Sequence, residues 1–391
     1  MKNYNFDKIL NRRGTNSVKY DLLKERFGKE DIMSMWVADM DFACPDFITQ
    51  AISKRLQHPI FGYSIRPESF FKSVVNWMKE RHQWDVKTSE ISFSPGVVPG
   101  LFLALKAFSK PGDKIIVQQP VYFPFFTTVS ENDRQLVSNN LIEKDDYYTM
   151  DFENLEKQID EKCKMIFVSN PHNPVGRAWK KDELHKLVDI CKRHNVLIIS
   201  DEIHSDLILK PNKHIPLASI SDDAAAITLT LMAASKTFNI AGLSTSIVIS
   251  KNPILLKKYN EAMDATHLMQ GNIFGTVATE AAYTHGAKFV DNLMSYISEN
   301  IDYVEEFIFK NLPKIEFKRP EATYLLWLNM KAYNLSDKKL MDFFVNEAGI
   351  AVNSGKTFGS SGSRYVRLNA ALPKSELIMS MNKLKAAIDK I

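Results

Sequence analysis

Two ionisable side chains follow apolar, strand-like runs and are the first candidates for chemistry. Asp201 comes directly after the run at 196–200, and Lys236 follows the run at 227–231 after a few small residues. A carboxylate at the end of a buried strand is largely removed from water, so we expect Asp201 to have a cationic partner. Lys236 taken alone is a surface cation more often than a catalyst, and both interpretations stay open at this point.

Two loops beside other strand-like runs carry residues suited to binding a ligand. Residues 94–100, Ser-Pro-Gly-Val-Val-Pro-Gly, lead from a strand into a helix, where free backbone N–H groups form a natural phosphate site. An ordinary Gly-Pro turn is the alternative. Residues 169–176, Ser-Asn-Pro-His-Asn-Pro-Val-Gly, hold two Asn-Pro pairs, which suit either a rigid turn or a rigid ligand loop.

A metal site is another interpretation of the region around Asp201. Asp201 and His204 stand three positions apart and are of the residue types that bind metal ions. One carboxylate and one imidazole are too few without a second such pair. We therefore predict no metal site.

The elements that must position these residues form an α/β pattern between about residues 90 and 250. Short β-branched runs alternate with helical segments, such as 181–194, as in the βαβ units of a mostly parallel sheet. The strands are expected at 91–93, 114–117, 164–168, 196–200, 227–231 and 246–249. Because ligands bind at the carboxyl ends of strands in such sheets, we expect Asp201, Lys236 and the two loops to meet at one edge.

A change of pattern after about residue 285 predicts a second, smaller α+β domain. A long amphipathic stretch at 289–312 is followed by strand-like runs at 324–328, 350–352 and 365–368. We expect residues 49–287 to form the large domain and residues 288–391 the small one. Residues 1–48 are expected to contribute an N-terminal segment to the small domain.

Composition and charge exclude several classes of function. The 391 residues are 45% hydrophobic and 25% charged, which is typical of a globular protein and unlike a disordered one. The 50 Lys and Arg are scattered among 46 Asp and Glu, so neither nucleic acid nor a membrane is a predicted partner. No apolar run approaches the length of a membrane-spanning helix. Three separated Cys residues and an N-terminus without a signal-peptide pattern predict a cytoplasmic protein.

Taken together, the motifs resemble the aspartate aminotransferase superfamily of pyridoxal-phosphate enzymes, fold type I. Within it they are most similar to the MalY/PatB branch of cystathionine β-lyases and cystalysin-like C-S lyases. The resemblance covers nearly the whole chain, and the separations between Asn173, Asp201 and Lys236 are close to those of the family. Further matching motifs are Asn-Arg-Arg-Gly-Thr at 11–15, Trp-Val-Ala-Asp-Met-Asp-Phe at 36–42, Phe-Gly-Tyr at 61–63 and Arg-Tyr-Val-Arg-Leu-Asn at 364–369.

The resemblance implies a role for each residue around the cofactor ring. Lys236 matches the lysine that binds pyridoxal phosphate covalently. Asp201 matches the carboxylate that keeps the pyridinium nitrogen protonated, which makes the ring an electron sink. Asn173 matches the residue that hydrogen-bonds the phenolic oxygen, and Tyr122 the aromatic stacked on the ring; a turn residue and a core aromatic are the alternatives. His204, a further cofactor-binding candidate, replaces the tyrosine of many aminotransferases, in agreement with the C-S lyase branch.

The cofactor phosphate has its own set of implied contacts. They come from the backbone of Gly96 and Val97 and from the Ser235 hydroxyl. In the family, Tyr63 reaches this phosphate from the neighbouring subunit. The resemblance therefore implies a homodimer in which Tyr63 acts across the interface.

Arg367 is the residue implied to bind the substrate. It matches the arginine that holds the α-carboxylate, where planar bidentate pairing fixes the amino acid so that its Cα–H stands perpendicular to the ring. An ordinary surface ion pair is the alternative. Asn173, Ala38 and Tyr63 complete the predicted substrate site.

The resemblance predicts a carbon-sulfur β-lyase that converts L-cystathionine or a related cysteine S-conjugate to pyruvate, ammonia and a thiol. Lys236, Asp201 and Tyr122 are the candidate catalytic residues, with Lys236 as the base that takes the Cα proton. A class I/II aminotransferase, which needs a keto-acid acceptor, is the first alternative. A regulatory binding protein on the same scaffold is the second. The preferred sulfur substituent is not predicted, because the pocket beyond Cβ is built from loops that the sequence does not place. Its candidate residues, which suit the core equally well, are Tyr122, Phe123, Trp36 and Met40.

Overall fold

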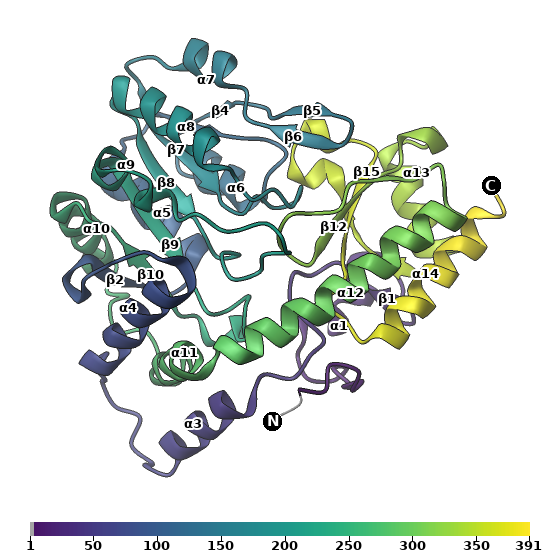
Figure 1. Ribbon diagram of the computed structural model, residues 1–391, viewed down its shortest axis with the longest axis horizontal. Coiled ribbons are helices and arrows are strands. Elements are labelled where there is room, and N and C mark those ends of the chain that lie inside the picture. Colours follow the sequence, from purple (N-terminus) through teal and green to yellow (C-terminus); the bar gives the residue numbers. More distant parts are fainter. Residues whose placement is uncertain (1–3) are drawn as a thin grey trace.

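The computed structural model describes residues 4–391 and is organised around a seven-stranded sheet (Figure 1). Strands β9, β8, β7, β3 and β4 are parallel, whereas β10 runs antiparallel to both of its neighbours. Most strand residues other than those of the edge strand β4 are buried, as expected for a sheet covered on both faces. In spatial order the strands are β2 (Ile91–Ser94), β10 (Ser246–Ile249), β9 (Thr228–Met232), β8 (Leu197–Asp201), β7 (Cys163–Ser169), β3 (Lys114–Val117) and β4 (Gln135–Ser138).

Helices cover both faces of this sheet. One face packs through an apolar cluster that includes Phe167 and Tyr259, and the other through a cluster around Ile166 and Trp179. Ile166 and Phe167 are successive residues of β7, so their side chains point to opposite faces of the sheet and each joins a different cluster. The first face carries α5 (Val97–Phe108), α6 (Pro124–Ser130) and α10 (Pro253–Ala265), and the second α7 (Phe152–Gln158), α8 (Lys181–Arg193) and α9 (Asp222–Ile227).

Three further helices pack together beside the β2 edge of the sheet (Figure 1). They are α3 (Asp46–Leu56), α4 (Glu68–His82) and α11 (Ile273–His285). The segment between α3 and α4 has neither helix nor strand, and most of its residues are exposed. Tyr63 lies in this segment.

A second unit is built around a four-stranded antiparallel sheet. Its strand order is β11 (Glu316–Phe317), β12 (Leu325–Asn329), β15 (Tyr365–Asn369) and β14 (Asn353–Ser354). The N-terminal segment joins this unit, because β1 (Met33–Ser34) pairs in parallel with β13 (Ile350–Ala351). The division at residues 48 and 287 stays a prediction. The unit's helices are α1 (Val18–Asp21), α2 (Leu23–Phe27), α12 (Ala287–Asn311), α13 (Asp337–Asp342) and α14 (Lys374–Ile388).

The apolar runs predicted most strands within one or two residues. Residues 114–117 and 246–249 match β3 and β10 at both ends. The prediction missed β4 and the hairpin of β5 (Ile142–Lys144) and β6 (Tyr147–Thr149). These strands are three or four residues long and partly exposed, so they lack the buried β-branched pattern.

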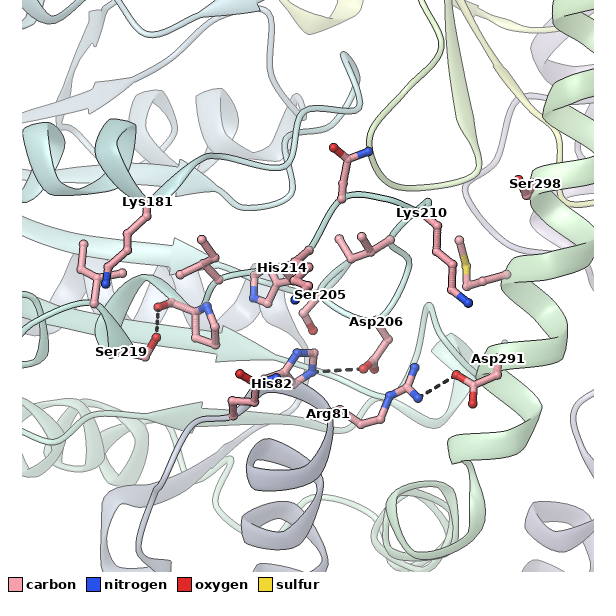
Figure 2. Close-up of a pocket in the computed structure, with 18 of the residues that line it drawn as sticks. Arg81, His82, Lys181, Ser205, Asp206, Lys210, His214, Ser219, Asp291 and Ser298 are labelled. Atoms are coloured by element: carbon pink, nitrogen blue, oxygen red, sulfur yellow. Dashed lines mark hydrogen bonds and ion pairs between the residues drawn. The ribbon is translucent and has the colours of Figure 1, made fainter.

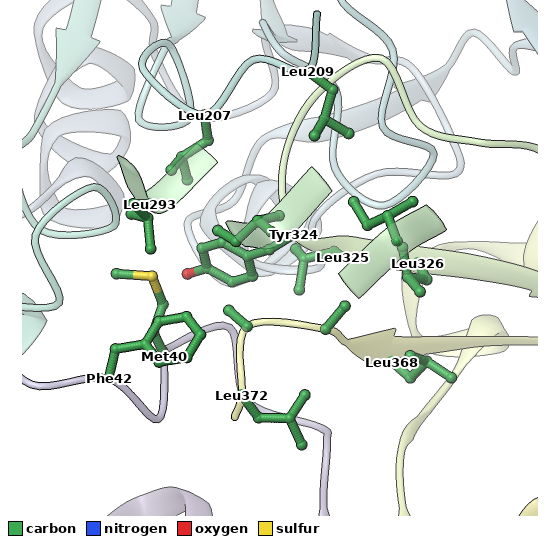
Figure 3. Packing of buried hydrophobic residues seen from close by; sticks show 14 of the residues in the cluster. Met40, Phe42, Leu207, Leu209, Leu293, Tyr324, Leu325, Leu326, Leu368 and Leu372 are labelled. Carbon is green, nitrogen blue, oxygen red and sulfur yellow. The ribbon is translucent and has the colours of Figure 1, made fainter. Parts of the chain in front are cut away.

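The largest apolar cluster joins the two units. Met40 and Phe42 of the N-terminal segment pack with Tyr324, Leu325 and neighbouring residues of the small sheet (Figure 3). Met40 is fully buried, so of its two possible places it occupies the core. None of the helices in residues 4–391 combines the length and the apolar character needed to cross a membrane.

Candidate active site

The carboxyl ends of β2, β7, β8 and β9 lie at the same edge of the large sheet. β7, β8 and β9 are parallel, and β2 has their direction because β10 is antiparallel to both β2 and β9. Ser169 and Asp201, the last residues of β7 and β8, are partners in register, and Asn170 donates to the Asp201 carbonyl at 2.9 Å. This edge therefore brings together the four segments that the sequence singled out.

Lys236 lies in a turn after β9 and points its amine at the N-terminal segment. The Nζ donates to the carbonyl oxygen of Ala38 at 2.7 Å. Burial lowers the pKa of Lys236 to about 8, although the negative charges of Asp39 and Asp201 act to raise it. The amine is therefore neutral in about a tenth of the molecules at pH 7, far more often than an ordinary lysine.

Asp201 is a buried carboxylate without a complete set of donors. Its Oδ1 accepts the backbone N–H of Ile203 at 3.1 Å, and residues 4–391 provide no side-chain donor to it. Burial raises the pKa of Asp201 to about 7, although the Ile203 N–H and the charge of Lys236 act to lower it. A cationic or N–H donor from a ligand would complete this site.

Arg367, on β15 of the small sheet, is the second buried cation. Its Nη1 donates to Asn173 Oδ1 at 3.0 Å, and its Nη2 donates to Asn353 Oδ1 at 2.7 Å and to the Trp36 carbonyl at 3.0 Å. The Nε has no partner, and within residues 4–391 no carboxylate forms an ion pair with this guanidinium. Burial lowers the pKa of Arg367 to about 10. The alternative of a surface ion pair is thus wrong, because the guanidinium is buried and no carboxylate of residues 4–391 pairs with it.

Asn173 and Tyr122 lie with these charged groups. Asn173 is held by its contact with Arg367 and by its backbone N–H, which donates to Ser169 Oγ at 3.2 Å. The ring of Tyr122 is largely buried, and burial and the charge of Asp201 raise the pKa of its hydroxyl. Tyr122 therefore faces the same site as Asp201 and Arg367.

His204 is buried beside the site as a neutral imidazole. Burial lowers its pKa to about 3, and the charges of Lys236 and Arg367 act in the same direction. Its Nδ1 has no partner, and its ring meets that of Tyr324 edge-on, with centroids 6.4 Å apart. Within residues 4–391 no group of three His, Cys, Asp or Glu side chains is arranged to hold a metal ion.

The predicted phosphate contacts lie at the start of α5 and in the Lys236 turn. The first α-helical bond of α5 runs from the Gly100 N–H to the Gly96 carbonyl, so the N–H of Val97 has no helical acceptor. The Ser235 hydroxyl, one residue before Lys236, makes no hydrogen bond to the described part of the chain. These donors are free to bind an anion.

Tyr63 is not part of the cluster that one chain assembles. Its side chain is 97% exposed, in the segment between α3 and α4. Its predicted contact to the phosphate depends on a second subunit. That role stays a prediction.

The resemblance placed Ala38 in the substrate site, and that role stays a prediction. Sequence reasoning missed that backbone carbonyl groups of the same segment enclose the site. Residues 36–42, here called the strap, present the Trp36 carbonyl to Arg367 and the Ala38 carbonyl to Lys236. The Tyr324 hydroxyl donates to the same Ala38 carbonyl at 3.0 Å, and Asn369 donates to two more strap carbonyls. Backbone acceptors carry no side-chain signal in a sequence. The role of Asn369 could have been considered from the sequence, because this residue ends the matching motif at 364–369.

The strap is anchored by a cluster of paired charges, here called the charge cluster: Arg12, Lys19, Asp39 and Asp41. Arg12 donates to Asp39 and to Asp41, each at 2.7 Å, and Lys19 donates to Asp41 at 2.7 Å. Burial alone would raise the pKa of Asp39, but the bond from Arg12 and the charge of Lys19 lower it. The carboxylate of Asp39 thus stays charged near Lys236.

Comparison with known proteins places the chain in a family. The family described as aminotransferase class I and II matches residues 30–384. The chain belongs to this family. Cystathionine beta-lyase PatB of Bacillus subtilis is 43% identical over 98% of this chain and 100% of its own length.

Solved structures extend the comparison to the fold. Cystalysin from Treponema denticola, which contains a pyridoxal 5'-phosphate cofactor, has a TM-score of 0.96 at 37% identity and covers 99% of both chains. The PLP-bound C-S lyase from Staphylococcus hominis has a TM-score of 0.92 at 35% identity and covers 98% of both chains. The predicted fold class, fold type I with a mostly parallel sheet and a smaller α+β unit, is confirmed.

Proposed function

We propose that this protein is a pyridoxal-phosphate-dependent carbon-sulfur β-lyase acting on L-cystathionine or a related cysteine S-conjugate. The overall reaction adds water and gives pyruvate, ammonia and a thiol. The observation that carries the proposal is the set of buried, incompletely paired groups Asp201, Lys236 and Arg367 at one sheet edge. The similarity to PatB and to two C-S lyases over nearly the full chain supports it.

The residues present fit the cofactor. Asp201 has an open acceptor for a protonated ring nitrogen, and Lys236 has a partly neutral amine for covalent attachment. Val97 and Ser235 offer free donors for the phosphate. When bound, pyridoxal phosphate supplies an electron sink that stabilises negative charge at the substrate Cα.

Arg367 supplies the charge that selects an amino acid. A buried guanidinium without an anion has lost solvation without recovering it from a partner. The α-carboxylate of a substrate completes this pair with two parallel hydrogen bonds. Asn173, Asn353 and Trp36 hold the guanidinium in place from three directions.

Lys236 moves the proton. Its amine, with a pKa of about 8, is a suitable base for the Cα–H near neutral pH. The Ala38 carbonyl accepts one N–H and so orients the amine. The protonated amine of Lys236 or the Tyr122 hydroxyl then donates to the leaving sulfur.

The proposal includes a homodimer and a cytoplasmic location. The segment around Tyr63 exposes several apolar side chains, which suits an interface. They are Ile60 (66% exposed), Phe61 (55%), Tyr63 (97%) and Ile65 (85%). The location stays a prediction from the cysteine pattern.

The test combines a visible absorption spectrum with a pyruvate assay on L-cystathionine, without any keto acid. We expect a cofactor band and pyruvate release. Lys236→Ala should abolish the band and lower kcat by at least about 10⁴-fold, because it removes both the attachment point and the base. Lys251→Ala, at an exposed lysine, is the control. Substantial turnover by Lys236→Ala would refute the assignment, and amino transfer only after adding a keto acid would favour the aminotransferase.

A further inference from the structure

A buried carboxylate outside the active site joins the two loops that carry Asp201 and Lys236. Asp206 lies five residues after Asp201, and its side chain is 3% exposed. It forms part of the floor of a cleft of about 670 Å³ between α4, α12 and the loop after β8 (Figure 2). The mechanism described above does not use this residue.

All polar partners of the Asp206 carboxylate come from α4 or from the Lys236 turn. Its Oδ1 accepts Trp77 Nε1–H at 3.1 Å and lies 3.1 Å from His82 Nε2. Figure 2 shows the His82 ring directed at this carboxylate. Its Oδ2 accepts the hydroxyl of Thr237 at 3.0 Å. Thr237 is fully buried and follows Lys236 in the chain.

Backbone hydrogen bonds between residues three or four positions apart form a turn on each side of the contact between Asp206 and Thr237. In the loop after β8, Ser205 N–H donates to the Glu202 carbonyl at 3.0 Å and Leu207 N–H to the His204 carbonyl at 2.9 Å. In the Lys236 turn, Phe238 N–H donates to the Ala234 carbonyl at 2.9 Å. The contact between Asp206 and Thr237 therefore links the loop that follows Asp201 to the turn that bears Lys236.

The charge on Asp206 strengthens the link. Burial alone would raise the pKa of Asp206, but the hydrogen bond and charge of His82, with Arg81 and Thr237, lower it. A hydrogen bond to an ionised acceptor is about twice as strong as one between neutral groups. The loss of the Thr237 hydroxyl would thus remove the only side-chain hydrogen bond between the Lys236 turn and the loop after β8 within residues 4–391.

We propose that Asp206 is a positioning residue that sets the place of Lys236 relative to Asp201 through the Thr237 hydroxyl. The inference rests on the proposed role of Lys236. A residue with only a structural role would change stability and leave the properties of the Lys236 amine as they are.

The test is the pH dependence of acetylation of Lys236 by acetic anhydride in the full-length, cofactor-free chain, followed by mass spectrometry. The unmodified protein should show a midpoint near the pKa of about 8. Thr237→Val keeps the shape of the side chain but removes the hydroxyl, so we expect the midpoint to move by about half a pH unit or more. In the holoenzyme we expect kcat to fall about tenfold while KM changes less than about twofold.

Thr230→Val is the matched control. Thr230 is also fully buried, but its hydroxyl has no hydrogen-bond partner in the described chain. Equal midpoints for Thr237→Val and Thr230→Val would overturn the proposal. Because the labelling does not require turnover, it separates this inference from the proposed lyase activity, which the pyruvate assay tests.

A double-mutant cycle tests whether Asp206 and Thr237 act through the same contact. Asp206→Asn keeps the size of the side chain but removes its charge. If the contact carries the effect, the double variant should shift the Lys236 midpoint no further than the larger single variant. Additive shifts would mean that the residues act independently and would overturn the proposal. Thr237→Val alone still decides the question if Asp206→Asn does not fold.

Discussion

The charge cluster and the sheet edge both bury charged groups, but they differ in how these groups are paired. Lys19 and Asp41 of the charge cluster are 1% and 3% exposed and lie 2.7 Å apart, with Arg12 as a second cation on Asp41. Arg367 at the sheet edge is also almost fully buried, yet its partners in the described chain are neutral oxygens. Every buried charge of the charge cluster thus has a partner of opposite charge, whereas Arg367 at the sheet edge has none in the described chain.

The difference separates a structural role from a binding role. A buried ion pair is destabilised by desolvation and stabilised by its partner, so the loss of one member is costly to the fold. A buried charge without a counterion destabilises the free protein, and a ligand of opposite charge relieves that cost. In the proposed function, the substrate carboxylate and the cofactor nitrogen are the ligands that relieve this cost at Arg367 and Asp201.

Breaking a pair in the charge cluster should have the largest effect on stability. We expect Lys19→Met to lower the free energy of unfolding by about 3 kcal/mol, because Asp41 loses its nearest buried cation. Lys24→Met removes an ion pair whose members are 76% and 59% exposed, and should lower the free energy of unfolding far less, because water screens the two charges. Urea unfolding measures both. Similar losses in the two variants would contradict the distinction between buried and exposed pairs.

Removing the unpaired cation should affect binding more than folding. Arg367→Ala deletes two charge-assisted hydrogen bonds to the substrate carboxylate, so we expect KM for L-cystathionine to rise about hundredfold. Steady-state kinetics of pyruvate release measure it. Arg26→Ala, at an exposed position, should leave KM unchanged. An unchanged KM in Arg367→Ala would show that the carboxylate is held elsewhere.

Removing the unpaired anion should change how stability depends on pH, by about 3 kcal/mol between pH 4.5 and 7.5. In the folded, cofactor-free protein the pKa of Asp201 is about 7, against an ordinary value of 3.8. The folded state therefore binds more protons between these values, and Asp201 makes stability fall as pH rises from about 4 to 7. Asp201→Asn should reduce this slope. Urea unfolding at pH 4.5 and 7.5 tests it, and an unaltered slope would contradict the raised pKa.

The sequence predicted the elements whose burial is periodic and the side chains at their ends. β3, β10 and α8 follow from apolar patterns, and the ends of β8 and β7 placed Asp201 and Asn173 at one edge. The resemblance placed Ala38 near the substrate, but the hydrogen bond from Lys236 to the Ala38 carbonyl could not be predicted. This contact uses a backbone atom and depends on a fold that joins residues nearly 200 positions apart. The hydrogen bond from Tyr324 to the Ala38 carbonyl could not be predicted either, because nothing in the sequence distinguishes Tyr324 from other aromatic residues before a strand.

The position of Arg367 on the small sheet and of Lys236 after the large sheet has a mechanical consequence. In the proposed function, a bound amino acid is held by its carboxylate from one unit while its Cα proton is taken by the other. The relative position of the two units then sets the distance between the Lys236 amine and the Cα–H bond. The apolar cluster that includes Met40 and Tyr324 joins the two units, so its packing holds them in this relative position.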